Sequence, residues 1–88
     1  MKARHVVAPG AVVVPVADEM VVWVPVGDMT HLLDPIATAV FHLAQLKEPE
    51  DVAAALAQQY GADVEEVLPD VHGLLTFLEH ERVLIPCP

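Results

Sequence analysis

The sequence predicts an α+β domain with a three-stranded antiparallel sheet followed by three helices, in the order β-β-β-α-α-α. A chain of 88 residues is long enough for one domain. Its composition changes once, at Asp34-Pro35: Val and Pro dominate before this point, and Ala, Leu, Gln and Glu dominate after it. The hydrophobic pattern also changes there, from short β-branched runs to helical spacing.

The first part predicts three strands. Residues 11–16 and 20–25 are rich in β-branched side chains and are separated by a hairpin-length connection, residues 17–19. Gly27 can supply a positive φ in the next turn, after which residues 29–33 return. Short strands joined by tight turns are typical of an antiparallel meander.

Asp34 is a suitable N-cap for the first helix, and Pro35 suits its first position. This helix should end near Leu46. Pro49 would begin the second helix, and Gly61 would end it as a C-terminal cap.

For the third helix, Asp63 and Glu66 resemble a capping box. Pro69 lies inside the pattern and predicts a bend or a separate first turn. The apolar stripe of this helix consists of Val64, Val67, Val71, Leu74, Leu75 and Leu78. Two helices joined around Gly61 beside a small sheet have the outline of a winged helix-turn-helix domain. Within the single domain 1–88 we expect a tail that could be flexible (1–9), the sheet (10–33), the helical part (35–82) and a short extended end (82–86).

The predicted sheet is apolar on both faces. In residues 20–25, Met20 and Val22 fall on one face and Val21 and Trp23 on the other. Three helices can cover only one face in so short a chain. The other face is therefore left for a partner or a second copy, unless the N-terminal tail folds over it.

The two sheet edges differ. Pro15 lies in the first strand and lacks an amide donor, which discourages strand addition there. Residues 29–33 contain no proline and no lysine, so this edge can accept an added strand. The alternative is an ordinary edge beside an ordinary core helix.

The charge balance excludes several partners. The net charge is −9, with four Lys/Arg against thirteen Asp/Glu, and the third helix has no Lys or Arg. Duplex nucleic acid and anionic membranes should be repelled, whereas basic peptides should be attracted. The uncharged stretch 8–17 is about half as long as a membrane-spanning helix needs. The single cysteine, Cys87, leaves no internal disulfide and favours a cytoplasmic location.

The residue types for catalysis are missing or scattered. The chain has no serine, its glycines are isolated, and Cys87 lies in a terminal tail. Its histidines lack paired ligand spacing: His5, His31, His42, His72 and His80. We therefore expect no metal site, no cofactor and no enzyme activity, and we expect His72 and His80 on the surface.

Two segments resemble the PqqD family of peptide chaperones, which share the RiPP recognition element fold (RiPP: ribosomally synthesised and post-translationally modified peptide). They are "GDMTHLLDPIATAVFHLAQ" and "EPEDVAAALAQQYGADVEEVLPDVHGLLTFLEHERVL". The residues that match the family pattern are Leu32, Leu33 and Asp34, then Glu66, Val67, Asp70, Val71, Leu74 and Leu75. The likeness extends from about Gly10 to Leu84. The "GDxTHLLDP" form is most similar to a branch found near a kinase related to HPr kinase.

The resemblance implies that the leader of a precursor peptide adds as a fourth strand beside residues 29–33, against the third helix. The domain would then present the peptide to a modifying enzyme, such as a radical SAM enzyme or a kinase-related maturase, without doing chemistry itself. Carried over, the groove involves Thr30, His31, Leu32, Leu33, Asp70, Val71, Leu74, Leu75 and Leu78.

Two other functions remain open at this stage. A winged-helix transcriptional regulator shares the outline but would need Lys or Arg on its recognition helix. A small structural subunit could self-associate through the apolar sheet. A homodimer, with or without strand exchange, is compatible with peptide binding as well.

Overall fold

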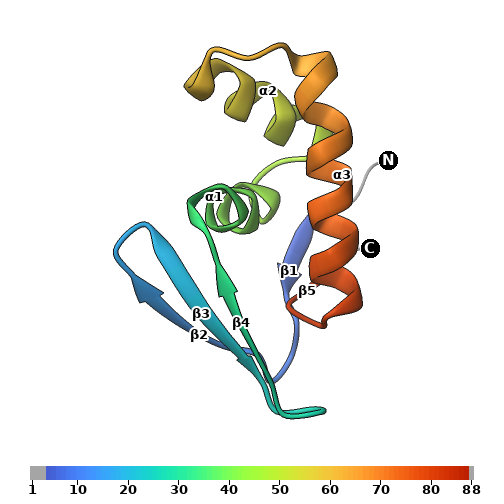
Figure 1. Ribbon diagram of the computed structural model, residues 1–88. Coiled ribbons are helices and arrows are strands. Elements are labelled where there is room, and N and C mark those ends of the chain that lie inside the picture. The colour runs from blue at the N-terminus through green and yellow to red at the C-terminus, as the bar shows by residue number, and fades with distance from the viewer. Residues whose placement is uncertain (1–3, 88) are drawn as a thin grey trace.

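The computed structural model describes residues 4–87 and has eight elements in two sheets and three helices. The strands are β1 (His5–Val7), β2 (Val12–Val16), β3 (Glu19–Val24), β4 (Met29–Leu33) and β5 (Leu84–Pro86), and the helices are α1 (Pro35–Ala44), α2 (Pro49–Tyr60) and α3 (Val64–His80). The predicted β-β-β-α-α-α order is confirmed for β2 to α3 (Figure 1).

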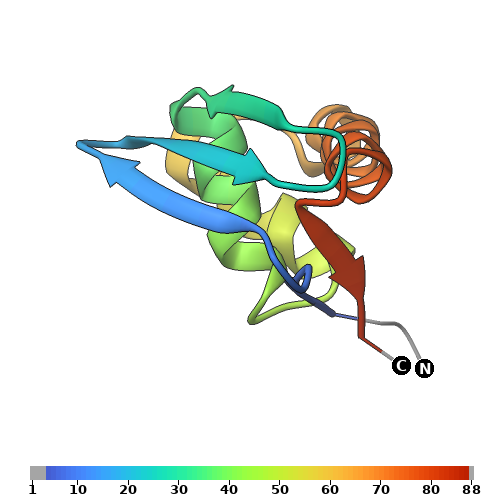
Figure 2. The ribbon, with the colours of Figure 1, turned by 90° about the horizontal axis from the view of Figure 1, so that it is seen from below.

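The larger sheet is an antiparallel meander in the order β2-β3-β4. On β3, Met20, Val22 and Val24 are buried against the helices. Val21 is partly buried and Trp23 is exposed, because alternate side chains of a strand point to opposite faces. Figure 2 shows the three strands lying in front of α1, with no described element over the near face of the sheet.

The helix signals at Asp34-Pro35 and Gly61 are confirmed. The Asp34 side chain accepts a hydrogen bond from the Ala37 amide at 2.8 Å, and Pro35 occupies the first turn of α1. Gly61 ends α2 with a φ of 65°, in the left-handed region that glycine enters without a Cβ penalty.

The start of α3 differs from the expected capping box. Asp63 is the N-cap, but its side chain makes no capping hydrogen bond, and the first turn is held by backbone bonds such as Glu66 N–H to Asp63 O at 3.0 Å. Pro69 lies inside one continuous helix, so no separate first turn forms. Its missing amide removes a single bond to the first turn.

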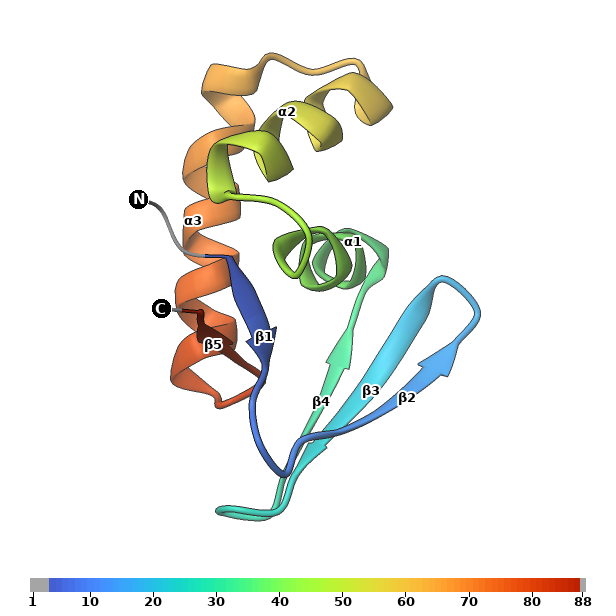
Figure 3. The same ribbon diagram turned by 180° about the vertical axis from the view of Figure 1, so that it is seen from behind.

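The two ends of the described chain pair with each other. β1 and β5 form an antiparallel pair in which Val6 lies opposite Ile85, and the Ala8 amide donates to Val83 O at 3.0 Å (Figure 3). Part of the expected N-terminal tail is therefore a strand, and the expected extended end is its partner. Sequence could not show this, because the two segments lie at opposite ends of the chain and each is only three residues long.

His5 joins this small sheet to α3. Its side chain is almost fully buried, and its Nε2 lies 2.6 Å from Glu79 Oε2. This contact connects β1 to the last turns of α3. Among residues 4–87, no helix is both long and apolar enough to cross a membrane.

Candidate functional site

β4 forms one edge of the larger sheet. It pairs with β3 alone, with His31 opposite Val22 and Leu33 opposite Met20. In the described part of the chain no strand pairs with its other side, because β1 pairs with β5. The backbone groups on that side are therefore open to an added strand.

The opposite edge is formed by β2, which contains Pro15 within its paired length. A proline has no amide hydrogen to give to an added strand. As expected from the sequence, one edge strand (β2) contains a proline and the other (β4) contains none.

The C-terminal end of β4 is fixed to α1. The buried Thr38 hydroxyl donates to the Leu33 carbonyl oxygen at 3.1 Å. The Asp34 cap described above adds a second constraint one residue later. Both contacts hold β4 in place before any partner arrives, which reduces the entropy lost on binding.

α3 presents two rows of side chains at helical spacing. Val71, Leu75 and Leu78 are buried in the core. A second row is at most partly buried: Asp70 and Phe77 are exposed, and Leu74 and Glu81 are intermediate. We call Asp70, Leu74, Phe77 and Glu81 the groove row, because their 4-3-4 spacing puts them on one side of α3 and of its C-cap.

His31 connects β4 to the lower part of the groove row. Its ring meets the Phe77 ring edge-on, with centroids 5.8 Å apart. Its Nε2 lies 3.2 Å from Glu81 Oε1. The side chains of β4 and α3 therefore touch at this end, and Figure 1 shows the two elements diverging from there.

A cavity of about 170 Å³ lies at the other end of the groove row. Three helices contribute to it, and its lining is Ile36, Leu56, Tyr60, Val67, Asp70, Val71 and Leu74. Ile36 lies in the first turn of α1, which begins two residues after β4 ends, and is half exposed. Asp70 is the only charged residue in the lining, so the cavity fits an apolar or aromatic side chain and favours a cation near its mouth.

The structure separates the predicted peptide-binding residues into three groups. Thr30, His31 and Leu32 lie on the open strand, and Asp70 and Leu74 lie in the groove row. The remaining four are buried in the core: Leu33, Val71, Leu75 and Leu78. Of these four, Val71 also reaches the cavity wall.

Six further residues of the site were missed by the sequence analysis: Phe77 and Glu81 in the groove row, and Ile36, Leu56, Tyr60 and Val67 in the cavity lining. Phe77 and Glu81 continue the spacing that begins at Asp70 and Leu74, and this signal was available in the sequence. Ile36 and Tyr60 are each about half exposed. Only the packing of α1, α2 and α3 shows that they line a cavity with Asp70.

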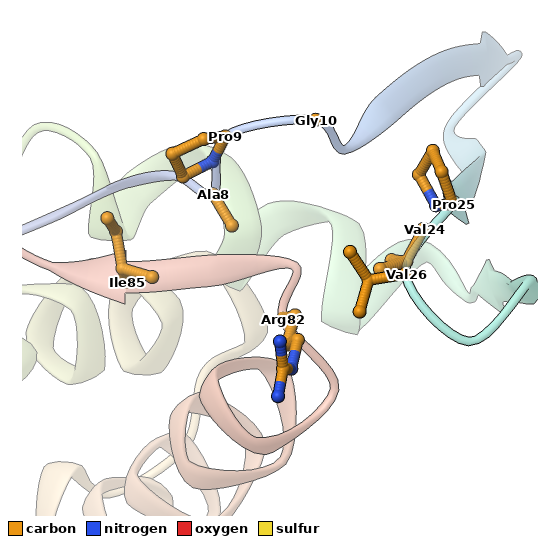
Figure 4. Close-up of a pocket in the computed structure, with 8 residues that line it drawn as sticks. All are labelled: Ala8, Pro9, Gly10, Val24, Pro25, Val26, Arg82 and Ile85. Carbon is orange, nitrogen blue, oxygen red and sulfur yellow. The ribbon is translucent and has the colours of Figure 1, made fainter.

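A second, larger cavity of about 430 Å³ borders neither the groove row nor the 170 Å³ cavity. Figure 4 shows its lining, Ala8, Pro9, Gly10, Val24, Pro25, Val26, Arg82 and Ile85, with Arg82 as the only charged side chain. None of the predicted peptide-binding residues borders it.

The histidines do not assemble into a site. His72 and His80 are exposed, as expected, and His5 and His31 each face one glutamate. No group of three or more metal-ligating side chains occurs within the described residues.

The fold and the site define a small α+β domain that presents one open strand edge beside a partly exposed helix row. The chain belongs to the PqqD family: the model described as "Coenzyme PQQ synthesis protein D (PqqD)" matches residues 19–84. No protein with a curated description matches the chain in sequence.

Two solved structures are similar to the chain in fold. "TbiB1 in Complex with the TbiA(beta) Leader Peptide" has 24% sequence identity and a TM-score of 0.80, and covers 96% of this chain and 94% of that one. "Lasso peptide synthetase B1 complexed with the leader peptide" has 20% identity and a TM-score of 0.84, and covers 94% of this chain and 99% of that one.

Proposed function

We propose that this domain binds the leader segment of a ribosomally made precursor peptide and presents it to a modifying enzyme, without catalysing a reaction itself. The leader adds as a strand beside β4 and packs against the groove row of α3. One observation carries this proposal: the edge of β4 is open over five residues, next to a partly apolar helix row, in a chain of the PqqD family. The two structural neighbours support it, because both are described with a leader peptide.

The site divides the binding energy between backbone and side chains. Strand addition satisfies β4 backbone groups whatever the peptide sequence is, whereas the groove row and the 170 Å³ cavity select side chains. Asp70 and the acidic first turn of α3, with Glu65 and Glu66, favour a leader that carries Lys or Arg.

The proposal extends to the type of modifying enzyme to which the domain presents the leader. The "GDxTHLLDP" form of residues 27–35 supports the branch associated with a kinase related to HPr kinase. A radical SAM enzyme is the other candidate. The proposal places the domain in the cytoplasm, where the ribosome releases the precursor.

A winged-helix regulator fits the charges of α3 less well than a peptide-binding domain does. The arrangement of α2 and α3 around Gly61 beside the sheet is what suggested a winged helix-turn-helix. A recognition helix that contacts phosphates needs Lys or Arg, and α3 has neither.

Two neighbouring proline substitutions test strand addition. Consecutive amides of a strand point to opposite sides, so Thr30→Pro and His31→Pro remove one amide that faces β3 and one that faces outward. The inward substitution should lower the free energy of unfolding. The outward one should leave the domain folded and weaken leader binding at least about tenfold, through a lost hydrogen bond and steric exclusion.

The measurement uses fluorescein-labelled synthetic peptides that cover the short reading frames beside the gene, titrated by fluorescence anisotropy. Thr30→Ala and His31→Ala are the matched controls, since they shorten the side chains and keep both amides. If the folded proline variant binds as the parent does, or if none of the peptides binds the parent, strand addition at β4 is wrong.

A further inference from the structure

The outer face of the larger sheet is exposed and mostly apolar. Valines on β2, Trp23 on β3 and Leu32 on β4 are between 43% and 66% exposed. The strand register aligns them in two cross-strand rows, Val12-Trp23-Thr30 and Val14-Val21-Leu32, with Val16 beside Glu19. We call these eight residues the outer face.

The outer face is ordered and uncovered by the rest of the described chain. The Trp23 indole N–H donates to Asp28 Oδ1 at 3.0 Å, which fixes the ring at one end of the face. The opposite face of the same sheet is buried under the helices, and the pair β1–β5 lies elsewhere (Figures 2 and 3). A continuous apolar surface of this kind, bordered by polar residues, is typical of a protein interaction site.

The charges around the outer face favour a partner other than a second copy. No Lys or Arg occurs between Arg4 and Lys47, a stretch that contains the whole sheet. Asp18 and Glu19 lie at one end of the face and Asp28 at the other. Two copies, each with a net charge of −9, would bring these carboxylates together, whereas a protein with Lys or Arg around an apolar centre would complement them.

The outer face reaches the edge where the peptide is proposed to add. Leu32, at 66% exposure, stands on β4 and points to the outer face. Alternate residues of an added strand would point the same way and extend the face by one strand. The surface seen by a partner is therefore larger when the leader is bound.

We propose that the outer face docks the modifying enzyme, through an apolar patch of that enzyme bordered by Lys or Arg, and that the bound leader completes the docking surface. This inference rests on the proposed function. It implies that leader and enzyme raise each other's affinity for the domain, because such coupling is reciprocal.

A pair of lysine substitutions tests the proposal. Val14→Lys places a cation on the outer face at the middle of β2, and Leu46→Lys makes the same change at an exposed leucine between α1 and α2. The purified modifying enzyme encoded beside the gene is titrated against each domain, with and without the labelled leader peptide. Val14→Lys should weaken enzyme binding at least about tenfold and Leu46→Lys less than about twofold, with leader affinity unchanged in both.

The other outcomes are equally decisive. Equal losses in both variants, no loss in Val14→Lys, or no binding of the enzyme to the parent domain overturns the docking proposal. A parent dimer in light scattering that Val14→Lys dissociates assigns the face to a second copy and also overturns it. If the parent binds no leader, the proposed function fails separately, and the peptide-free titration still accepts or rejects docking at the outer face.

Discussion

The two rows of α3 have similar side chains and different surroundings. Val71, Leu75 and Leu78 are almost fully buried, whereas Leu74 is partly exposed and Phe77 is 46% exposed. An apolar residue on this helix can therefore serve either the core or the groove. The difference in exposure shows that hydrophobic spacing predicts the helix, whereas the packing of neighbouring elements decides which of its rows stays exposed.

The largest expected effect comes from the core row. Leu75→Ala should lower the free energy of unfolding by about 2–5 kcal/mol, because it leaves a cavity in the hydrophobic core. The measurement is chemical denaturation followed by circular dichroism. Leader affinity, corrected for the folded fraction, should stay close to that of the parent.

If folded Leu75→Ala lost leader affinity, the separation of α3 into a core row and a groove row would be wrong, and Leu75 would belong to the binding site. Thr76→Ala is the matched control, since Thr76 lies next in the helix and is exposed.

Phe77→Ala should have the opposite profile. Half of the ring is already in solvent and its ring contact within the described chain is with His31, so the free energy of unfolding should fall by less than about 1 kcal/mol. Leader affinity should fall about tenfold, because the ring is the largest apolar surface of the groove row.

Isothermal titration calorimetry with the leader peptide measures this loss. Phe77→Leu retains an apolar side chain and should recover part of the affinity. A Phe77→Ala variant that binds normally would remove the groove row from the site.

The smallest expected effect is electrostatic. Asp70→Asn removes the only charge in the lining of the 170 Å³ cavity. Affinity for a leader with Lys or Arg should fall about two- to threefold at low salt, and the difference should shrink as salt screens the exposed charge. Leader titrations at two salt concentrations measure it.

Glu65→Gln is the matched control, since Glu65 lies in the acidic first turn of the same helix and outside the cavity lining. Equal effects of the two substitutions would mean that the leader responds to the overall charge of α3 and not to Asp70 in particular.

Local signals in the sequence were enough for most of the elements. The Asp34-Pro35 step, Gly61 and the β-branched runs act through neighbouring residues and backbone geometry, and each predicted its helix or strand. The difference between the two edges was also local, since Pro15 on one strand and the absence of proline in residues 29–33 are properties of single positions. That β4 stays unpaired on one side among the described residues depends on the pairing of β1 with β5.

The sequence was less informative where two distant segments meet. It did not show that residues 5–7 pair with residues 84–86, or that Leu33, Leu75 and Leu78 are core residues. Both results depend on packing between elements, which spacing along one element cannot reveal.

The sequence by itself determined the order of elements, the acidic charge, the different proline content of the two sheet edges and the membership of the PqqD family, because these depend on residue types and their local spacing. Only the tertiary structure decided which row of α3 stays partly exposed, how His31 meets Phe77 and Glu81, and which sheet face stays uncovered. The physical reason is that burial is a property of pairs of surfaces: α1 can cover one face of the sheet, and residues 4–87 supply no element for the other.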